Sequence, residues 1–234
     1  MYQTKKTFVK SDTLVYDLII DNPNILLLIE HFEASPNVAD LTISEYCNMN
    51  KINEEIFILF ANLYNGFNKI DISKLKTDDI SQIVSFLKNC HTYYLKEKYP
   101  EIIGLISELR ETNKGKEIDL ILKFFNEYFD EVREHLDYED SIVFPYIQNL
   151  INNSNNLALN STFSVDEYRE HHTDIEFKLT ELNNLLLKHI KISVGIRILR
   201  RIIFNLFELE QDLFVHSIIE ENVLVPLVKR IENV

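Results

Sequence analysis

The sequence predicts an all-α protein in which an antiparallel four-helix bundle follows a small helical domain. From residue 77 onward, apolar residues recur at steps of three and four, which is the period of an α-helix. The chain of 234 residues contains four glycines and five prolines, too few for a β architecture that is rich in turns. Its hydrophobic fraction of 46% supplies a sizeable core, and its aromatic fraction of 11% argues against disorder.

Residues 1–75 contain short apolar segments that are separated by turn-forming residues. Thr42 is followed three residues later by Glu45, which is the spacing of a capping box. Asn53 precedes two glutamates, as the residue at the start of a helix often does. We therefore expect three or four short helices in a domain of residues 1–75, and the bundle in residues 76–234.

Four long helices are expected in the bundle. The first spans about residues 77–110 and contains Pro100, which should kink it or change it locally. The second spans about 116–150, the third runs from near Ser164 to near residue 189, and the fourth continues from about 193 to the C-terminus. Four long helices favour an antiparallel bundle.

The strongest functional signal is an internal repeat in which His is followed four residues later by Glu, and six residues after that by Pro. The two copies lie on the second and fourth long helices: His135, Glu139 and Pro145, then His216, Glu220 and Pro226. Corresponding residues are 81 positions apart. Side chains four residues apart share one face of a helix, so each copy directs an imidazole and a carboxylate at the same point.

The residues around both copies are mostly apolar: Leu136, Ile142, Val143 and Phe144, then Ile219, Val223, Leu224 and Val225. A single His–Glu pair at this spacing is usually a solvated pair on a helix surface. Two copies beside a buried stripe are different, because four buried titratable groups without partners would be costly and a bound metal removes that cost. The repeat therefore predicts a metal site in the bundle core.

The other two long helices each offer a histidine. His91 continues the apolar stripe of the first helix, where a structural role is the alternative to metal binding. On the third helix, His172 lies in register with a stripe that includes Leu179, Leu182 and Leu186, whereas His171 lies about 100° away. We expect His172 as the ligand and leave His171 open as the alternative.

The predicted ligands are four imidazoles and two carboxylates: His91, His135, Glu139, His172, His216 and Glu220. This set suits iron or another borderline metal better than calcium or magnesium. A structural zinc needs four ligands, so six indicate two metals. We expect two iron ions bridged by the glutamates, with coordination positions open to dioxygen, nitric oxide or peroxide.

The pattern of these six residues resembles the hemerythrin-like (HHE) di-iron family over about residues 77–234. Hemerythrins proper usually place a further His four residues after the ligand of the third helix. Here that position is Glu176, so the resemblance does not imply simple oxygen carriage. We interpret Glu176 as a solvated neighbour of the site, with an additional ligand as the alternative.

Residues 13–33 and 41–63 resemble the small domain that precedes the bundle in repair-of-iron-centres proteins. Those proteins respond to nitrosative and oxidative stress and are implicated in restoring damaged iron–sulfur clusters. Their small domain usually carries a Cys-Cys pair, where this chain has Ala34-Ser35-Pro36. Thiol chemistry of that kind is not expected here, because Cys47 alone is a poor substitute. His31, near this point, is expected at the surface or as a cap.

Charge and composition exclude several classes of partner. A net charge of −13 argues against nucleic acid and against anionic lipid, because both need clustered Lys and Arg. We find neither a signal peptide near the N-terminus nor an apolar stretch long enough to span a membrane. Two cysteines without a CxxC pair suit a reducing cytosol, so we expect a cytoplasmic protein.

The resemblance implies a stress-response di-iron protein that repairs iron–sulfur centres, with damaged iron–sulfur proteins as partners. The alternative is a module that binds or senses oxygen or nitric oxide and acts through a protein partner. A third interpretation is a hydrogen-bonded His and Glu core without metal. Three tyrosines lie within about a turn of predicted ligands and are candidates for hydrogen bonding or radical quenching, with core packing as the alternative: Tyr94, Tyr138 and Tyr168. The sequence does not settle whether the protein is an enzyme, or its oligomeric state.

Overall fold

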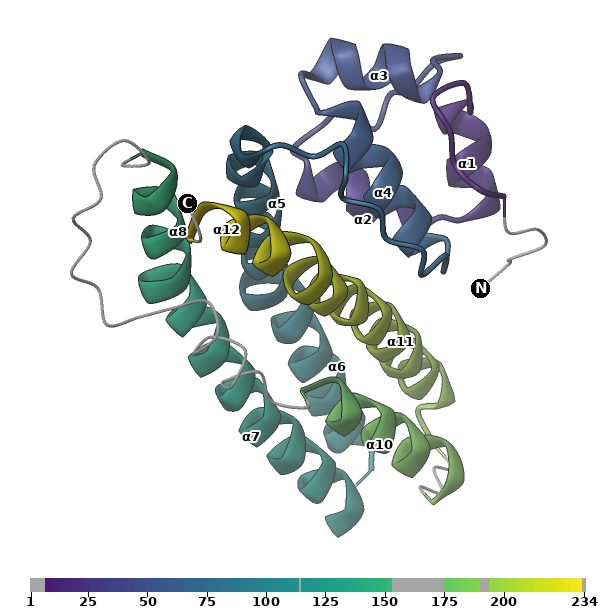
Figure 1. Ribbon diagram of the computed structural model, residues 1–234. Coiled ribbons are helices and arrows are strands. Elements are labelled where there is room, and N and C mark those ends of the chain that lie inside the picture. Colours follow the sequence, from purple (N-terminus) through teal and green to yellow (C-terminus); the bar gives the residue numbers. More distant parts are fainter. Residues whose placement is uncertain (1–6, 114, 153–174, 190–193, 233–234) are drawn as a thin grey trace. The chain divides into compact units, whose positions relative to one another are not determined.

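The computed structural model describes residues 7–113, 115–152, 175–189 and 194–232, and it confirms the all-α prediction (Figure 1). In these residues the only extended pairing is an isolated antiparallel bridge between Leu14 and Thr42. Among the described helices, none combines the length and the apolar character that crossing a bilayer requires.

The chain forms two compact units. The first contains the described residues of Met1–Cys90, Phe144–Glu170 and Val215–Val234, and the second contains those of His91–Val143 and His171–Phe214. The domain boundary that we expect near residue 75 stays a prediction.

Short helices at the N-terminal end of the first unit match the expectation for this region. They are α1 (Val15–Asp21), α2 (Ile25–His31), α3 (Ile43–Asn50) and α4 (Glu54–Tyr64). The Thr42 side chain accepts a hydrogen bond from the Glu45 amide and completes a capping box at the start of α3. Asn53 caps α4, because its side chain accepts from the amides of Glu55 and Ile56. Both predicted helix starts are confirmed.

An aromatic cluster holds α2 and α4 against helix α5 (Ile80–Tyr93) within the first unit. The Phe86 ring of α5 lies 4.8 Å from that of Phe32 and 4.9 Å from that of Phe60, centroid to centroid. The His31 ring meets Phe86 edge-on at 5.4 Å, and the Asn89 side chain donates to the His31 carbonyl at 2.9 Å. His31 is only 1% exposed, so a surface or capping role for it was a wrong prediction. Its burial depends on Phe86, which is distant in sequence.

The last helix of the chain, α12 (Val225–Glu232), fixes the segment that leads into the short 3-10 helix η1 (Thr77–Asp79). The Arg230 guanidinium donates to the carbonyls of Ile72 and Leu75, each at 3.1 Å. These two bonds join segments of the first unit that lie far apart in the sequence.

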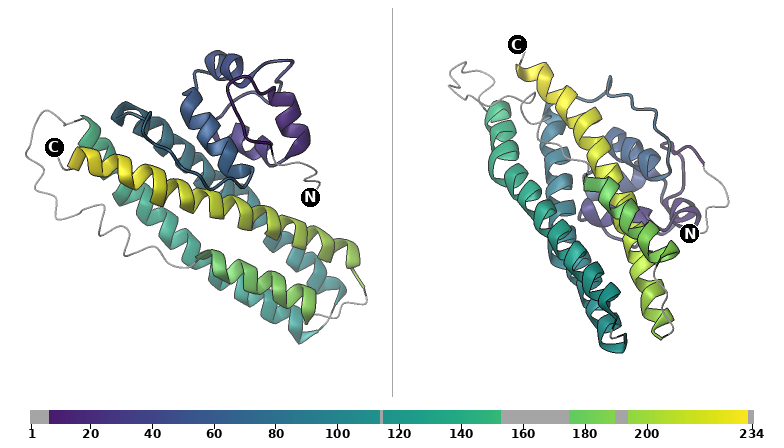
Figure 2. Two further views of the ribbon diagram at one scale, coloured as in Figure 1. Left: turned by 45° about the vertical axis from the view of Figure 1, so that its right-hand side comes forward. Right: turned by 90° about the horizontal axis from the view of Figure 1, so that it is seen from below.

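Four helices of the second unit form a closed bundle, and Figure 2 shows them side by side. They are α6 (Tyr99–Thr112), α7 (Lys116–Tyr138), α10 (Ile175–Lys188) and the part of α11 (Ile196–Ile219) up to Phe214. Ring stacking at 4.6 Å between Tyr99 and Phe129 joins α6 to α7, and an ion pair between Lys178 and Glu131 joins α10 to α7. Asn183 donates to Glu210 at 2.8 Å, which joins α10 to α11.

Helix α11 closes the bundle by packing antiparallel to the first long helix. Asn113, just after α6, donates to the carbonyl of Val194, just before α11, and Lys98, just before α6, donates to Asn205. In the predicted seam of the third helix, the described residues Leu179, Leu182 and Leu186 are buried, as expected. The predicted start of that helix near Ser164 lies outside the described residues.

In the described residues, three long helices contain a π-helical turn that is separated from a following proline by one residue. The turns are η2 (Tyr94–Lys98), η3 (Glu139–Val143) and η4 (Glu220–Leu224). Each begins six residues before its proline, which is Pro100, Pro145 or Pro226. Proline has no amide hydrogen, and in a regular α-helix its ring clashes with the carbonyl four residues earlier. The wider π turn relieves this clash. This is the form that the predicted local change at Pro100 takes.

The cap of α4 is worth a measurable share of stability. Asn53 also donates to Asp79 at 2.8 Å, so its side chain joins α4 to η1. We expect Asn53→Ala to lower the free energy of unfolding by about 1–2 kcal/mol, because it removes the cap and this bond. Asn53→Ser is the control, since serine also caps well and should recover part of the loss. Equal stability of both variants and the wild type in urea titrations would contradict the assignment.

The Cys47 thiol should be unreactive in the folded protein. Burial, reinforced by the negative charge of Glu54, raises the pKa of Cys47 to about 12. A raised thiol pKa keeps the nucleophilic thiolate scarce at all lower pH values. Iodoacetamide at pH 8 should therefore modify Cys47 far more slowly in the folded protein than in urea, as measured by peptide mass spectrometry. The same rate in both states would show that the thiol is accessible.

Candidate metal centre

Each copy of the His–Glu repeat places an imidazole beside a carboxylate. Glu139 and Glu220 are the first residues of η3 and η4, and both side chains are 0% exposed. His135 Nε2 lies 3.1 Å from Glu139 Oε1, and His216 Nδ1 lies 3.3 Å from Glu220 Oε2. The spacing of four residues thus has the effect that we predicted from helix geometry.

His91 of α5 contributes a third imidazole, and it is buried. Its Nε2 lies 3.2 Å from Glu139 Oε2, while its Nδ1 lies 3.2 Å from Asp140 Oδ1. Glu139 therefore meets a different imidazole with each of its two oxygens. Asp140 was not predicted from the sequence, and the only sequence signal for it is its position next to Glu139.

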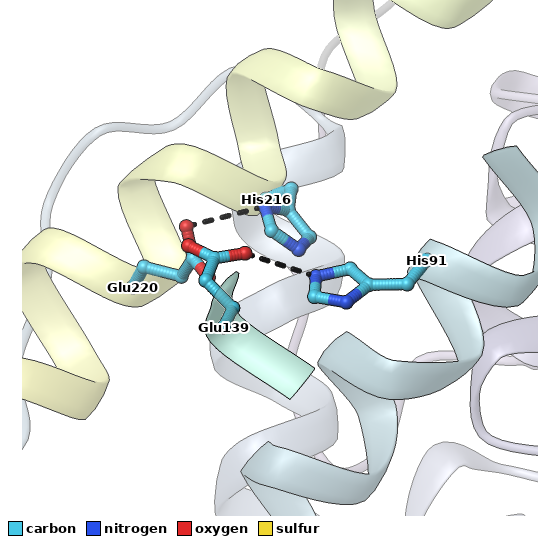
Figure 3. A group of neighbouring side chains, drawn as sticks. All are labelled: His91, Glu139, His216 and Glu220. Atoms are coloured by element: carbon cyan, nitrogen blue, oxygen red, sulfur yellow. Dashed lines mark ion pairs between the residues drawn. The ribbon is translucent and has the colours of Figure 1, made fainter. Parts of the chain in front are cut away.

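His91, Glu139, His216 and Glu220 form a buried cluster that could hold a metal ion (Figure 3). One ligand atom from each of the four lies within 4.8 Å of the others. Figure 3 shows the His91 ring directed at Glu139, and the His216 ring close to Glu220.

A hydrogen bond one turn from the histidines holds the two helices together at this level. The Tyr94 hydroxyl donates to Asp212 Oδ2 at 2.8 Å. Tyr94 follows His91 by three residues, and Asp212 precedes His216 by four on the same continuous helix α11. Because a helical turn is about 5.4 Å long, this bond constrains the spacing of both imidazoles. Asp212 was also missed, although its spacing from His216 places it on the same helix face.

The other predicted ligands have different outcomes. His135 is not in the four-residue cluster, but it contacts Glu139 directly. His172 and its alternative His171 lie outside the described residues. Glu176 belongs to α10, but its side chain lies outside the described set. The six-ligand set therefore stays a prediction.

The apolar residues around the repeat are buried, with one exception. Ile142 is 46% exposed, although we expected it in the buried stripe. Glu139 and Val143 of the same π turn point inward, so Ile142, directly before Val143, is directed to the outside.

The charges at Glu139 and His91 support each other. Burial raises the pKa of Glu139, but hydrogen bonds with His135 and His91 outweigh this effect and hold the pKa well below its usual value. Burial lowers the pKa of His91, yet hydrogen bonds with Asp140 and Glu139 more than offset it and raise this pKa to about 9. These contacts therefore favour the charged forms of both Glu139 and His91.

The donor set fits a transition metal. Burying an ionised carboxylate is costly unless a cation compensates it, and here two lie in one cluster. Imidazole and carboxylate ligands bind such metals at about 2.1 Å, so neighbouring ligand atoms on one ion lie about 3.0–3.4 Å apart. The nitrogen–oxygen distances of 3.1–3.3 Å match this spacing. Mixed imidazole and carboxylate sites suit borderline metals.

The fold and this cluster define a metal-binding protein built on a helical bundle. Comparison with known families matches residues 82–228 to the family described as Hemerythrin HHE cation binding domain. The chain belongs to this family, and the matched segment includes the whole cluster. None of the curated proteins compared with the chain matches it.

Loss of the Glu139 carboxylate should weaken metal binding severely. We expect Glu139→Gln to lower the affinity for Co²⁺ by more than about 100-fold, because outer hydrogen-bond partners alone are worth 10–100-fold. Chelator competition followed by the visible spectrum of the bound ion gives the affinity. Glu134→Gln, on an exposed glutamate of α7, is the matched control and should leave the affinity unchanged. Equal affinity in both variants would remove Glu139 from the ligand set.

Proposed function

We propose that this protein carries a non-haem di-iron centre and acts against nitrosative or oxidative stress, in the repair of iron–sulfur centres. The proposed ligands are the six predicted residues: His91, His135, Glu139, His172, His216 and Glu220.

The observation that carries the di-iron proposal is the position of the Glu139 carboxylate. Its Oε1 faces His135 and its Oε2 faces His91. Each oxygen of Glu139 would thus be available to an ion together with one imidazole, so this carboxylate would help to hold two ions. Glu220, at the equivalent position of the other copy and equally buried, would serve as the second shared carboxylate. A symmetric set of carboxylates and histidines from facing helices is how bundles build di-iron sites.

Bound iron would supply the redox chemistry and bind the small oxidant or nitric oxide. The protein's part is to hold and orient the ligands. Asp140 holds His91 Nδ1, so that Nε2 is directed at Glu139. Tyr94 and Asp212 maintain the spacing of the helices that carry His91 and His216. Apolar side chains that exclude water surround the carboxylates, which strengthens every electrostatic contact there.

The repair role rests on the resemblance of the N-terminal helices to the small domain of repair-of-iron-centres proteins. Damaged iron–sulfur proteins are the proposed partners, and the cytoplasm is the proposed location. Neither Cys47 nor Cys90 forms a disulfide, and both are buried, which suits a reducing compartment. Because the chain lacks the Cys-Cys pair, the chemistry is assigned to the metal centre alone.

A second candidate function is a module that binds oxygen or nitric oxide and signals through a protein partner. One observation favours it: helix α5 carries both His91 and the Phe86 ring on which α2 and α4 pack. The proposed gas-binding residue His91 thus belongs to the same helix as the residue that contacts the N-terminal helices.

Metal analysis with an optical spectrum tests the di-iron proposal. Protein purified without added metal should contain about two iron ions per chain, as di-iron bundles do, with oxo-bridged ferric bands in the near-ultraviolet. Both should vanish in the His135→Ala, His216→Ala double variant. An absence of metal, or one zinc ion that the substitutions leave untouched, would overturn the proposal.

Cluster repair separates the two candidate functions. Iron-loaded protein should restore the activity of a [4Fe–4S] enzyme that nitric oxide has damaged, whereas the double variant should not. Reversible gas binding without restoration, together with a co-purifying protein, would favour the sensing module instead.

A further inference from the structure

Two adjacent tyrosines connect the candidate centre with the surface inside the second unit. Tyr93 ends α5 and Tyr94 begins η2, and their ring centroids are 5.8 Å apart. The Tyr94 hydroxyl donates to Asp212 and the Tyr93 hydroxyl donates to Glu208, both at 2.8 Å. Both acceptors belong to α11 and lie one turn apart. Each phenol thus has its own carboxylate.

Tyr94 occupies the position that carries a carboxylate in the other two helices with a π turn. It lies six residues before Pro100, as Glu139 does before Pro145 and Glu220 before Pro226. All three are the first residues of their π turns and are fully buried. In the first helix, a phenol therefore stands where the repeat places an inward-directed glutamate.

The hydrogen-bond acceptor of Tyr93 is closer to the surface than that of Tyr94. Tyr94 and its acceptor Asp212 are both buried. Tyr93 is also buried, but the side chain of its acceptor Glu208 is 38% exposed and forms an ion pair with Lys98. The Lys98 ammonium lies 5.8 Å from the centre of the Tyr93 ring. The two phenols thus span from the interior to a charged group at the surface.

A buried phenol can lose an electron only if its proton has an acceptor, because a protonated phenoxyl cation would be a charge without compensation in an apolar site. The hydrogen-bonded carboxylates supply such acceptors. Core packing alone would not need a carboxylate at each hydroxyl.

We propose that Tyr94 and Tyr93 pass single electrons from the surface to the metal centre when hydrogen peroxide oxidises it. The Tyr94 O–H bond breaks, the electron moves to the centre and the proton moves to Asp212. Tyr93 then returns an electron to the Tyr94 phenoxyl, which takes its proton back from Asp212, while the Tyr93 proton moves to Glu208.

The reaction balances with a one-electron reductant in solution such as ascorbate. The reductant gives one electron to the Tyr93 phenoxyl, and Glu208 returns the proton to it. Two such electrons and two protons from water convert one hydrogen peroxide into two water molecules. The inference rests on the proposed function, because it requires a redox-active metal.

Electron paramagnetic resonance of the iron-loaded full chain, frozen after addition of hydrogen peroxide, tests this path. The wild type should give a tyrosyl radical signal that narrows when the protein contains β-deuterated tyrosine. Tyr94→Phe should reduce this signal to background, whereas Tyr93→Phe should keep it and slow its decay in ascorbate. Tyr128→Phe, on a buried tyrosine of α7 near the Tyr99 ring, is the matched control and should resemble the wild type.

Iron content and the near-ultraviolet spectrum are measured on the same samples. Normal iron content with an undiminished radical in Tyr94→Phe, or wild-type decay in Tyr93→Phe, would overturn this inference and leave the proposed function intact. An absence of iron in the wild type would overturn both. If Tyr94→Phe loses iron, Asp212→Asn decides, because its amide still accepts the hydrogen bond but cannot take the proton. A wild-type radical yield in that variant would overturn the inference.

Discussion

The burial of two carboxylates in one cluster is the constraint on which the rest of this structure depends. Glu139 and Glu220 are fully removed from water, and an ionised carboxylate in that environment must be compensated. His91 and His135 approach Glu139, while His216 approaches Glu220. The low pKa of Glu139 and the high pKa of His91 show how far these contacts offset desolvation.

The prolines contribute by fixing where the helices change their winding. A π turn precedes Pro100, Pro145 and Pro226, and in the two copies of the repeat it begins at the buried glutamate. An inserted residue rotates the later part of a helix relative to its earlier part, so the side chains on both sides of the turn can meet different neighbours. The His, Glu and Pro of each copy therefore act together, because the proline requires the π turn and the glutamate is the first residue of that turn.

Local periodicity explains which features could be predicted from the sequence. The long helices, the caps at Thr42 and Asn53 and the pairing of each His with its Glu depend on residues at most four apart. Asp140 and the burial of His31 depend on a partner from another helix, namely His91 and Phe86 respectively. The presence of Pro100 predicted a local change in the winding of its helix. That this change is a π turn depends on contacts that the residues after the turn make with other helices.

A single face of helix α5 carries both packing residues and a residue of the candidate metal centre. Its stripe of buried residues continues from Phe86 and Leu87 through His91 to Tyr94. The first two residues are apolar and the last two carry polar groups. Packing against α2 and α4 rigidifies the first part of the face, and the bond from Tyr94 to Asp212 anchors its end. His91 lies one turn before Tyr94, so the bond from Tyr94 to Asp212 helps to hold its imidazole within the narrow tolerance that a metal ligand requires.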